Sequence, residues 1–260
     1  MASNPEAARA TLAYRRQLAL IKANAIRALM NVWPDLDWVQ FERIWPQWVR
    51  IAYTITAQNR AAAVQITAAY LRTFRLLEGV PGDVVPKLAR TLDSAMFEIG
   101  LNATAREHLV RAALEAAREP DPRKAGLILR DARRKALDAA AGVMARHILN
   151  GGRETALQTM EADRYALGWA RVTDGNPCYW CAMLASRGPV YKTRETAGAN
   201  ARWHDHCGCT VELVYSDAYQ WPGRAEEFEQ LWYEVTGPYT GQDKVRAFRR
   251  AYAERYGVVK

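Results

Sequence analysis

The chain has 260 residues, a formal net charge of +8 and a sequence pI of about 9.4. This length allows a core of its own, so the fold as a whole does not depend on disulfides or metals. No apolar stretch approaches the ~20 residues of a membrane span, and the N-terminus lacks a signal peptide's basic start and apolar core. We therefore expect a protein made in a reducing cytoplasm, where thiols bind metal more often than they form disulfides.

The first third of the chain has the periodicity of long helices. One stripe at helical spacing predicts a first helix with Leu18, Ile21, Ala25 and Leu29 on one face. It should end at Pro34, because proline disfavours helical geometry in the preceding residue. A second helix is expected from near Trp38 to Leu77, interrupted or kinked at Pro46. A turn at residues 80–83 follows, and Asp83 is in position to cap the next helix.

Three more helices are expected before residue 172. The third should bury the stripe Leu88, Leu92, Met96, Ile99, Ala103, Val110 and Ala113. After a proline-rich break at 119–122, a fourth helix should pack through Leu137, Ala141, Met144 and Ile148. We expect it to stop at Gly151-Gly152, and a fifth helix to run from about Arg153 to Arg171. His108 and His147 are interpreted as ordinary helix residues.

The character of the sequence changes at residues 173–177, where turn residues replace helix formers. The alternation of Val211, Leu213 and Tyr215 predicts a strand at 210–215. If the extended backbone reaches back to Cys207 and Cys209, both thiols point to the same face. Two further helices are expected at about 224–234 and 242–256, and the last is the most basic local element.

All four cysteines and two of the four histidines lie between residues 178 and 209. A CxxC pair, Cys178 and Cys181, is followed by an HxxCxC run from His204 to Cys209. This is metal-ligand spacing, and zinc is the default occupant. Two residues between the thiols let both sulfurs reach one ion.

A structural zinc needs four ligands, and the segment offers six. We favour the set Cys178, Cys181, His204 and Cys207, with Cys209 as the strongest substitute and His206 in reserve. A site made only of the four cysteines is nearly as well supported. Asp205 is a candidate to orient a coordinating histidine from outside the coordination sphere.

Three other interpretations compete for these residues. A redox CxxC belongs at a helix start in a βαβ setting, which the surrounding pattern lacks. A pair of disulfides would require an oxidising environment. An HNH-type nuclease would use Asp205-His206, yet needs further histidine or asparagine residues, and 207–260 contain neither.

The positive charge favours an acidic partner, nucleic acid or an acidic protein surface. It is spread along the chain, with no block of five or six like charges, so a solvated arginine-rich surface explains it equally well. Four tryptophans near two prolines are expected to pack in the core: Trp33, Trp38, Trp45 and Trp48. Tyr179, Trp180 and Trp203 should form an apolar shell or a docking patch beside the ligands.

The run from Asp174 to Cys181, followed by His204–Cys209 leading into a strand, resembles the C-terminal motif of Mu F-type minor head proteins of tailed bacteriophages. These are also called head morphogenesis or minor capsid proteins, and the closest form is the compact one of actinobacteriophages. The resemblance marks as metal ligands Cys178, Cys181, His204, Cys207 and Cys209. It carries over no catalytic residue.

That resemblance implies a structural protein, not an enzyme, that resides in the virion near the portal after assembly in the host cytoplasm. It implies the portal as main partner, with the major capsid protein and packaged DNA, held through phosphates, as further candidates. Its cofactor would be a structural Zn²⁺. The alternatives are a zinc-dependent, HNH-like nucleic-acid-processing enzyme and a plain DNA-binding zinc module.

These observations predict a mainly α fold: an N-terminal helical array or bundle with a small C-terminal α+β zinc-binding module. We expect a helical domain over 1–170, the metal-binding module over 171–216 and a C-terminal helical segment over 217–260.

Overall fold

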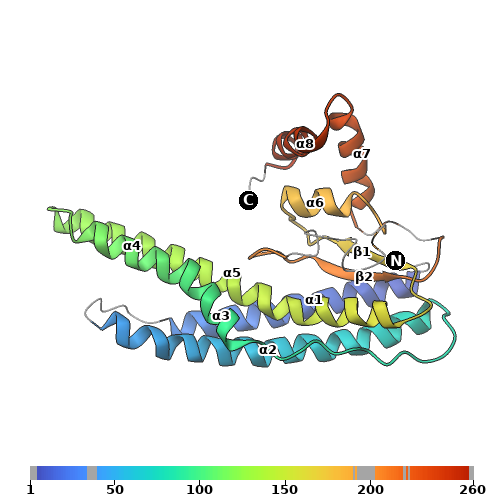
Figure 1. The fold of residues 1–260 in the computed structure, drawn as a ribbon, viewed down its shortest axis with the longest axis horizontal. Helices are drawn as coiled ribbons and strands as arrows, with labels where there is room; N and C mark the ends of the chain where they lie inside the picture. The colour runs from blue at the N-terminus through green and yellow to red at the C-terminus, as the bar shows by residue number, and fades with distance from the viewer. Residues whose placement is uncertain are drawn as a thin grey trace.

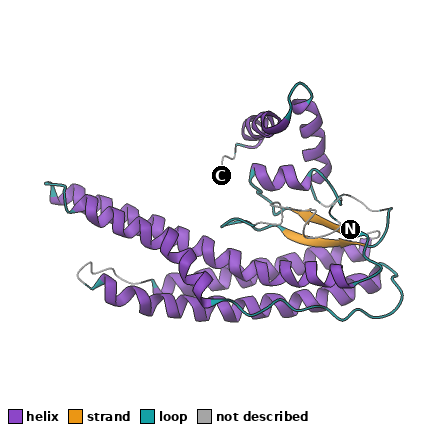
Figure 2. Ribbon diagram, viewed as in Figure 1, coloured by secondary structure: helices purple, strands orange, loops and turns teal. Residues whose placement is uncertain are grey.

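The computed structural model describes residues 5–33, 40–189, 191, 203–218, 221 and 223–257. The protein is mainly α, with a small α+β module near its C-terminus, as expected (Figures 1 and 2). Three long helices form the body: α1 (Pro5–Val32), α2 (Phe41–Leu77) and α5 (Pro122–Ala162). Between α2 and α5 the chain forms α3 (Ser94–Leu101), a π-helical turn (Asn102–Arg106) and α4 (Glu107–Ala116). Among the described helices, none is long and apolar enough to cross a membrane.

The module contains β1 (Gly168–Val172), α6 (Tyr179–Ala185), β2 (Thr210–Val214), α7 (Ala225–Thr236) and α8 (Gly241–Tyr256). The strands pair antiparallel, with Gly168 opposite Val214, and lie over the helical body (Figure 1). The expected strand is β2, and the two expected C-terminal helices are α7 and α8. The domain boundary expected at residue 170 falls within β1.

The helical body is held by two apolar clusters along α1, α2 and α5. In one, the rings of Tyr14 and Tyr70 stack at 4.2 Å, and their hydroxyls bond Thr67 and Thr11. The other contains the expected tryptophan packing: Trp45 and Trp48 are buried and Trp33 meets Trp48 edge-on. Trp38 lies outside the described residues. No interruption occurs at Pro46, since α2 is continuous through it.

The third helix begins later than the sequence predicts, at Ser94 instead of before Leu88. Residues 80–93 form a non-helical strap, and Asp93, instead of Asp83, caps α3 by accepting from the amides of Ala95 and Met96. The predicted buried face of this helix was also wrong, because the side chains of Met96 and Ile99 are more than half exposed. The buried positions recur every four residues, a spacing that the π-helical turn accommodates: Phe97, Leu101, Ala105 and Leu109.

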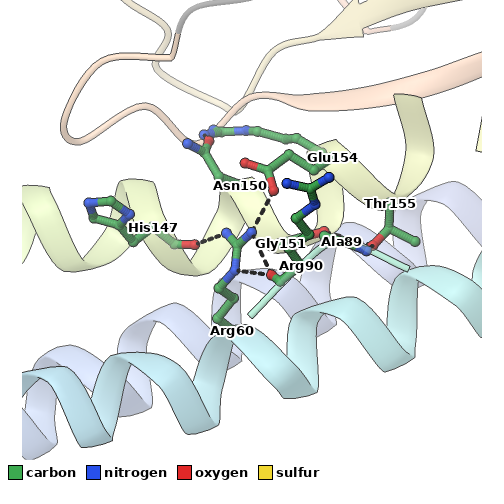
Figure 3. Close-up of polar contacts among 9 residues, drawn as sticks. Arg60, Ala89, Arg90, His147, Asn150, Gly151, Glu154 and Thr155 are labelled. Atoms are coloured by element: carbon green, nitrogen blue, oxygen red, sulfur yellow. Dashed lines mark hydrogen bonds and ion pairs between the residues drawn. The ribbon is translucent and has the colours of Figure 1, made fainter. Parts of the chain in front are cut away.

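The strap has no neighbouring strand within the described part of the chain, and its backbone N–H and C=O groups form hydrogen bonds with side chains of α2 and α5 instead (Figure 3). The amides of Lys87 and Ala89 donate to the hydroxyls of Thr159 and Thr155, at 2.9 and 3.0 Å. The buried Arg60 guanidinium donates to the carbonyls of Arg90 and His147 and pairs with Glu154 at 2.5 Å. Arg60 thus ties the strap and two helices together.

The expected stop at Gly151-Gly152 was also wrong, because α5 runs through both glycines. Each glycine lies where α5 approaches another helix closely. A Cβ at Gly151 would lie 3.0 Å from the Arg60 carbonyl oxygen, and one at Gly152 would lie 2.7 Å from Thr67 Oγ1. The fifth expected helix therefore merges with the fourth, and its final residues form β1.

Gly151→Ala should lower the free energy of unfolding by about 1–2 kcal/mol, because overpacking outweighs the gain in helix propensity. Gly126→Ala is the matched control in the same helix, since nothing lies within 4 Å of its added Cβ. It should raise stability by about 0.5–1 kcal/mol. Denaturant unfolding measures both, and two changes of the same sign would contradict the close-approach explanation.

Candidate metal centre

The CxxC pair lies at the start of α6. Asp174 accepts a hydrogen bond from the Asn176 amide, and the resulting turn delivers the chain to Cys178 in an extended conformation. Cys178 is the N-cap of α6, and its sulfur accepts from the Cys181 amide at 3.4 Å. The pair thus forms a knuckle in which a backbone amide faces a sulfur.

Two overlapping groups of possible ligands meet at Cys181. One joins Cys178, Cys181 and His204, and the other joins Cys181, Cys207 and Cys209. Within each group the ligand atoms lie within 4.8 Å of one another. His204 Nε2 is 2.9 Å from Cys178 Sγ, and the sulfurs of Cys181 and Cys207 are 3.5 Å apart. All five predicted ligands therefore come together, while which four bind an ion stays a prediction.

His206, held in reserve, points elsewhere. Its backbone is left-handed, with φ of 63°, and its Nε2 lies 3.6 Å from Asp138 Oδ2 on α5. The loop packs so closely there that a Cβ at Gly142 would lie 2.5 Å from His206 Nε2. The tight turn therefore separates the two histidines of the segment.

The backbone of Asp205, not its carboxylate, orients His204. The Asp205 carbonyl oxygen lies 2.8 Å from His204 Nδ1, and since a carbonyl only accepts, Nδ1 carries the proton. His204 Nε2 is thereby turned towards the sulfurs. The Asp205 carboxylate pairs instead with Arg146 of α5, at 2.5 Å.

Hydrogen bonds inside the cluster favour the thiolate, the form of cysteine that binds metal, at Cys178 and Cys207. The same bonds, from Cys178 and Cys207, raise the pKa of Cys181, and the pKa of Cys209 is also raised. Bonds with Cys181 and then His204 lower the pKa of Cys178 to about 4. Bonds with Cys181 and Cys209, aided by the charge of Arg153, hold the pKa of Cys207 well below its usual range. The bond to Cys178 raises the pKa of His204 to about 9.

Two buried arginines, which the sequence analysis missed, support the cluster. Arg153 of α5 donates to the carbonyls of Cys207 and Cys209 at 2.6–2.9 Å. Arg171 of β1 lies with Nη1 3.8 Å from Cys181 Sγ. Both guanidiniums lie over the ring of Trp203, at 4.1 and 3.6 Å from its centroid. Trp203 is therefore part of the shell around the cluster.

The chemistry of this donor set fits a divalent, sulfur-preferring cation. Three or four thiolates around such an ion leave a net negative charge, which the guanidiniums of Arg153 and Arg171 offset. Cys181, Cys207 and Cys209 are almost fully buried, whereas His204 is exposed. A cavity of about 620 Å³ borders the cluster and gives ions and chelators a path to it.

His147 lies outside both groups, on α5. Burial, followed by the charges of Arg146 and Arg60, lowers the pKa of His147 to about 4. The neutral form is thus favoured by the fold, whereas the unfolded chain takes up a proton near pH 6.5. Stability from this group is therefore present above pH 6.5 and is lost as the pH falls towards 4.

His147→Leu should remove part of the acid sensitivity, at most about 3 kcal/mol between pH 6.5 and 4. Denaturant unfolding at several pH values measures it, with His108→Leu as control, because His108 is an exposed histidine of α4. The explanation is wrong if the two variants show the same pH slope.

Fold and site define a mainly α protein in which a cysteine–histidine cluster of metal-binding geometry is packed onto the longest helix. The chain belongs to the VG15 protein family, whose model matches residues 6–235. It is 28% identical over 152 residues to the Gene 15 protein of Mycobacterium phage D29, covering 45% of this chain and 55% of that protein. It is 31% identical over 120 residues to the Gene 15 protein of Mycobacterium phage L5, covering 31% of this chain and 40% of that protein.

The matches thus span about half of the curated relatives' length or less. No solved structure matches the chain. These similarities place it among bacteriophage proteins, whereas the narrower resemblance to Mu F-type minor head proteins stays a prediction.

Proposed function

We propose that this chain is a structural minor head protein of a tailed phage, and that it carries one structural zinc ion. The observation that carries the proposal is the convergence of five sulfur and nitrogen donors in a chain of a phage family. The cluster is clamped to the body by Arg153 and Asp205, which suits a cross-link better than a mobile catalytic site.

The ion would be held by Cys178, Cys181 and Cys207, with His204 or Cys209 completing four ligands. Its contribution would be a cross-link between the start of α6 and the segment that leads into β2. The protein's own residues do the rest: Arg153 fixes the carbonyls of Cys207 and Cys209, and Asp205 orients His204.

In this proposal the protein joins the portal or the inner surface of the head during assembly in the host cytoplasm. The portal is the main partner, and the major capsid protein and packaged DNA are further ones. No catalytic step is assigned to any residue. The HNH-like alternative is disfavoured because it needs further histidine or asparagine residues after Asp205-His206, and residues 207–260 contain neither. Single-turnover cleavage of DNA with added divalent metal tests that alternative directly.

Quantitative mass spectrometry of purified proheads and virions tests the proposal. We expect the chain at a low, fixed ratio to portal in both particles. Co-purification of tagged portal with the wild-type chain and with Cys181→Ser then shows whether the cross-linked module is needed, and His206→Ala is the matched control. Absence of the chain from proheads and virions alike would overturn the structural role.

A further inference from the structure

Among the long helical stretches, the positive charge per residue is highest on two. Residues 122–135, the first third of α5, hold six basic residues against Asp131 alone: Arg123, Lys124, Arg130, Arg133, Arg134 and Lys135. α8 holds five basic residues against two acidic ones. α1 and α2 also have more basic than acidic residues, as the spread of charge along the sequence implies, but over many more residues. We call residues 122–135 the basic arm.

The basic arm extends away from the body. α4 and the start of α5 form a hairpin that projects beyond the ends of α1 and α2 (Figure 1). From residue 113 to 131, all of them described, no residue is buried. The first buried residue of α5 is Ala132, followed by Ala136. This hairpin buries little apolar surface, and its charged face is open to a partner.

One face of the basic arm carries a line of guanidiniums. Arg123, Arg130 and Arg134 are separated by seven and four residues, which places them on the same side of the helix. The line is roughly 16 Å long, at about 1.5 Å per residue. Over that length duplex DNA presents on the order of ten phosphate charges. The face therefore complements a linear polyanion.

The basic arm has more unpaired charge than α8, although the sequence marks α8 as the most basic element; on α8 only Lys244 and Arg250 have neither an ion pair nor a ring contact among the described residues. On α8, Arg246 pairs with Asp243 and Arg255 with Glu234, both at 3.0 Å, and Arg249 lies over Tyr179. On the basic arm, Asp131 engages only Arg134 and Lys135. Arg123, Lys124 and Arg130 are exposed, and the described residues give their side chains no ion pair.

We propose that the basic arm binds double-stranded DNA through its phosphates, independently of base sequence. This deepens the proposed function, which places the protein beside packaged DNA, by identifying the surface that faces it. Binding through about four phosphates gives log K a slope of about −3.6 against log salt concentration. Leu127, 58% exposed on the same face, is the feature that an acidic protein partner would use instead.

Fluorescence anisotropy of the full chain with a short labelled duplex of mixed sequence tests the proposal. The triple variant Arg123→Gln, Lys124→Gln, Arg130→Gln should weaken binding about 100-fold near 0.1 M salt and reduce the slope by about 3. The variant Lys244→Gln, Arg246→Gln, Arg250→Gln removes the same charge from α8 and should weaken binding much less. Unchanged circular dichroism establishes that both variants fold.

Equal weakening by the two variants would overturn the proposal, because net charge and not the basic arm would then set the affinity. So would unchanged DNA binding by the arm variant. If that variant instead loses portal in a pull-down, the arm faces an acidic protein. A failure of this proposal is distinguishable from a failure of the minor-head role. DNA binding is measured on the purified protein, whereas the minor-head role is tested by the composition of proheads and virions.

Discussion

Replacing Arg153 with methionine should lower the free energy of unfolding by about 3 kcal/mol. The change removes the donors to the buried carbonyls of Cys207 and Cys209, and each unpaired buried acceptor costs about 1–3 kcal/mol. Methionine keeps much of the apolar volume of the side chain, so the loss reports mainly on the hydrogen bonds. Denaturant unfolding gives the magnitude, and faster labelling of Cys207 and Cys209 by a thiol reagent would locate the damage.

Arg153→Lys keeps the charge but not the fork of donors, so we expect an intermediate loss. Arg164→Met, two residues past the end of the same helix, removes an exposed arginine and should change stability by less than about 0.5 kcal/mol. A loss for Arg153→Met no larger than that of Arg164→Met would show that Arg153 does not hold the module to the body.

Removing the metal should unfold the module and leave the helical body intact. α1, α2 and α5 contain 28, 37 and 41 residues and pack through their own clusters, whereas α6, α7 and α8 contain 7, 12 and 16. A strong chelator should therefore abolish a minority of the helical circular dichroism signal. The protein as purified should contain about one zinc per chain.

Cys181→Ser should reproduce the effect of the chelator, because Cys181 belongs to both groups of candidate ligands. His206→Ala is the matched control: it removes a histidine from the same loop but no predicted ligand. Complete loss of helix on chelation would contradict an independent body. Full zinc occupancy in Cys181→Ser would contradict the ligand assignment.

Elements with local signals could be predicted from the sequence. Pro34 marks the end of α1, and the alternation of apolar residues marks β2. Ligand spacing likewise identified the five residues that converge, because CxxC and HxxCxC each place their donors through local geometry.

The failures at Gly151, β1 and Arg153 depend on contacts between distant residues. Gly151 resembles a helix stop, yet Arg60, far away on α2, is what requires a glycine there. The sequence predicts helix over β1 because nothing nearby marks a strand there. Arg171 of β1 is buried against Trp203 and Cys181, which come later in the chain. No local sequence signal marks Arg153 as part of the site, since the cysteine carbonyls to which it donates lie more than fifty residues later.

The unbroken course of α5 has a mechanical consequence. Lys124 near its beginning and Arg153 near its end belong to one hydrogen-bonded rod, separated by roughly 44 Å at about 1.5 Å per residue. A helix is stiff along its axis, so the projecting hairpin and the cysteine cluster keep a fixed spacing. A partner bound to the hairpin and a partner bound beside the cysteine cluster would therefore be held at a fixed distance from each other by α5.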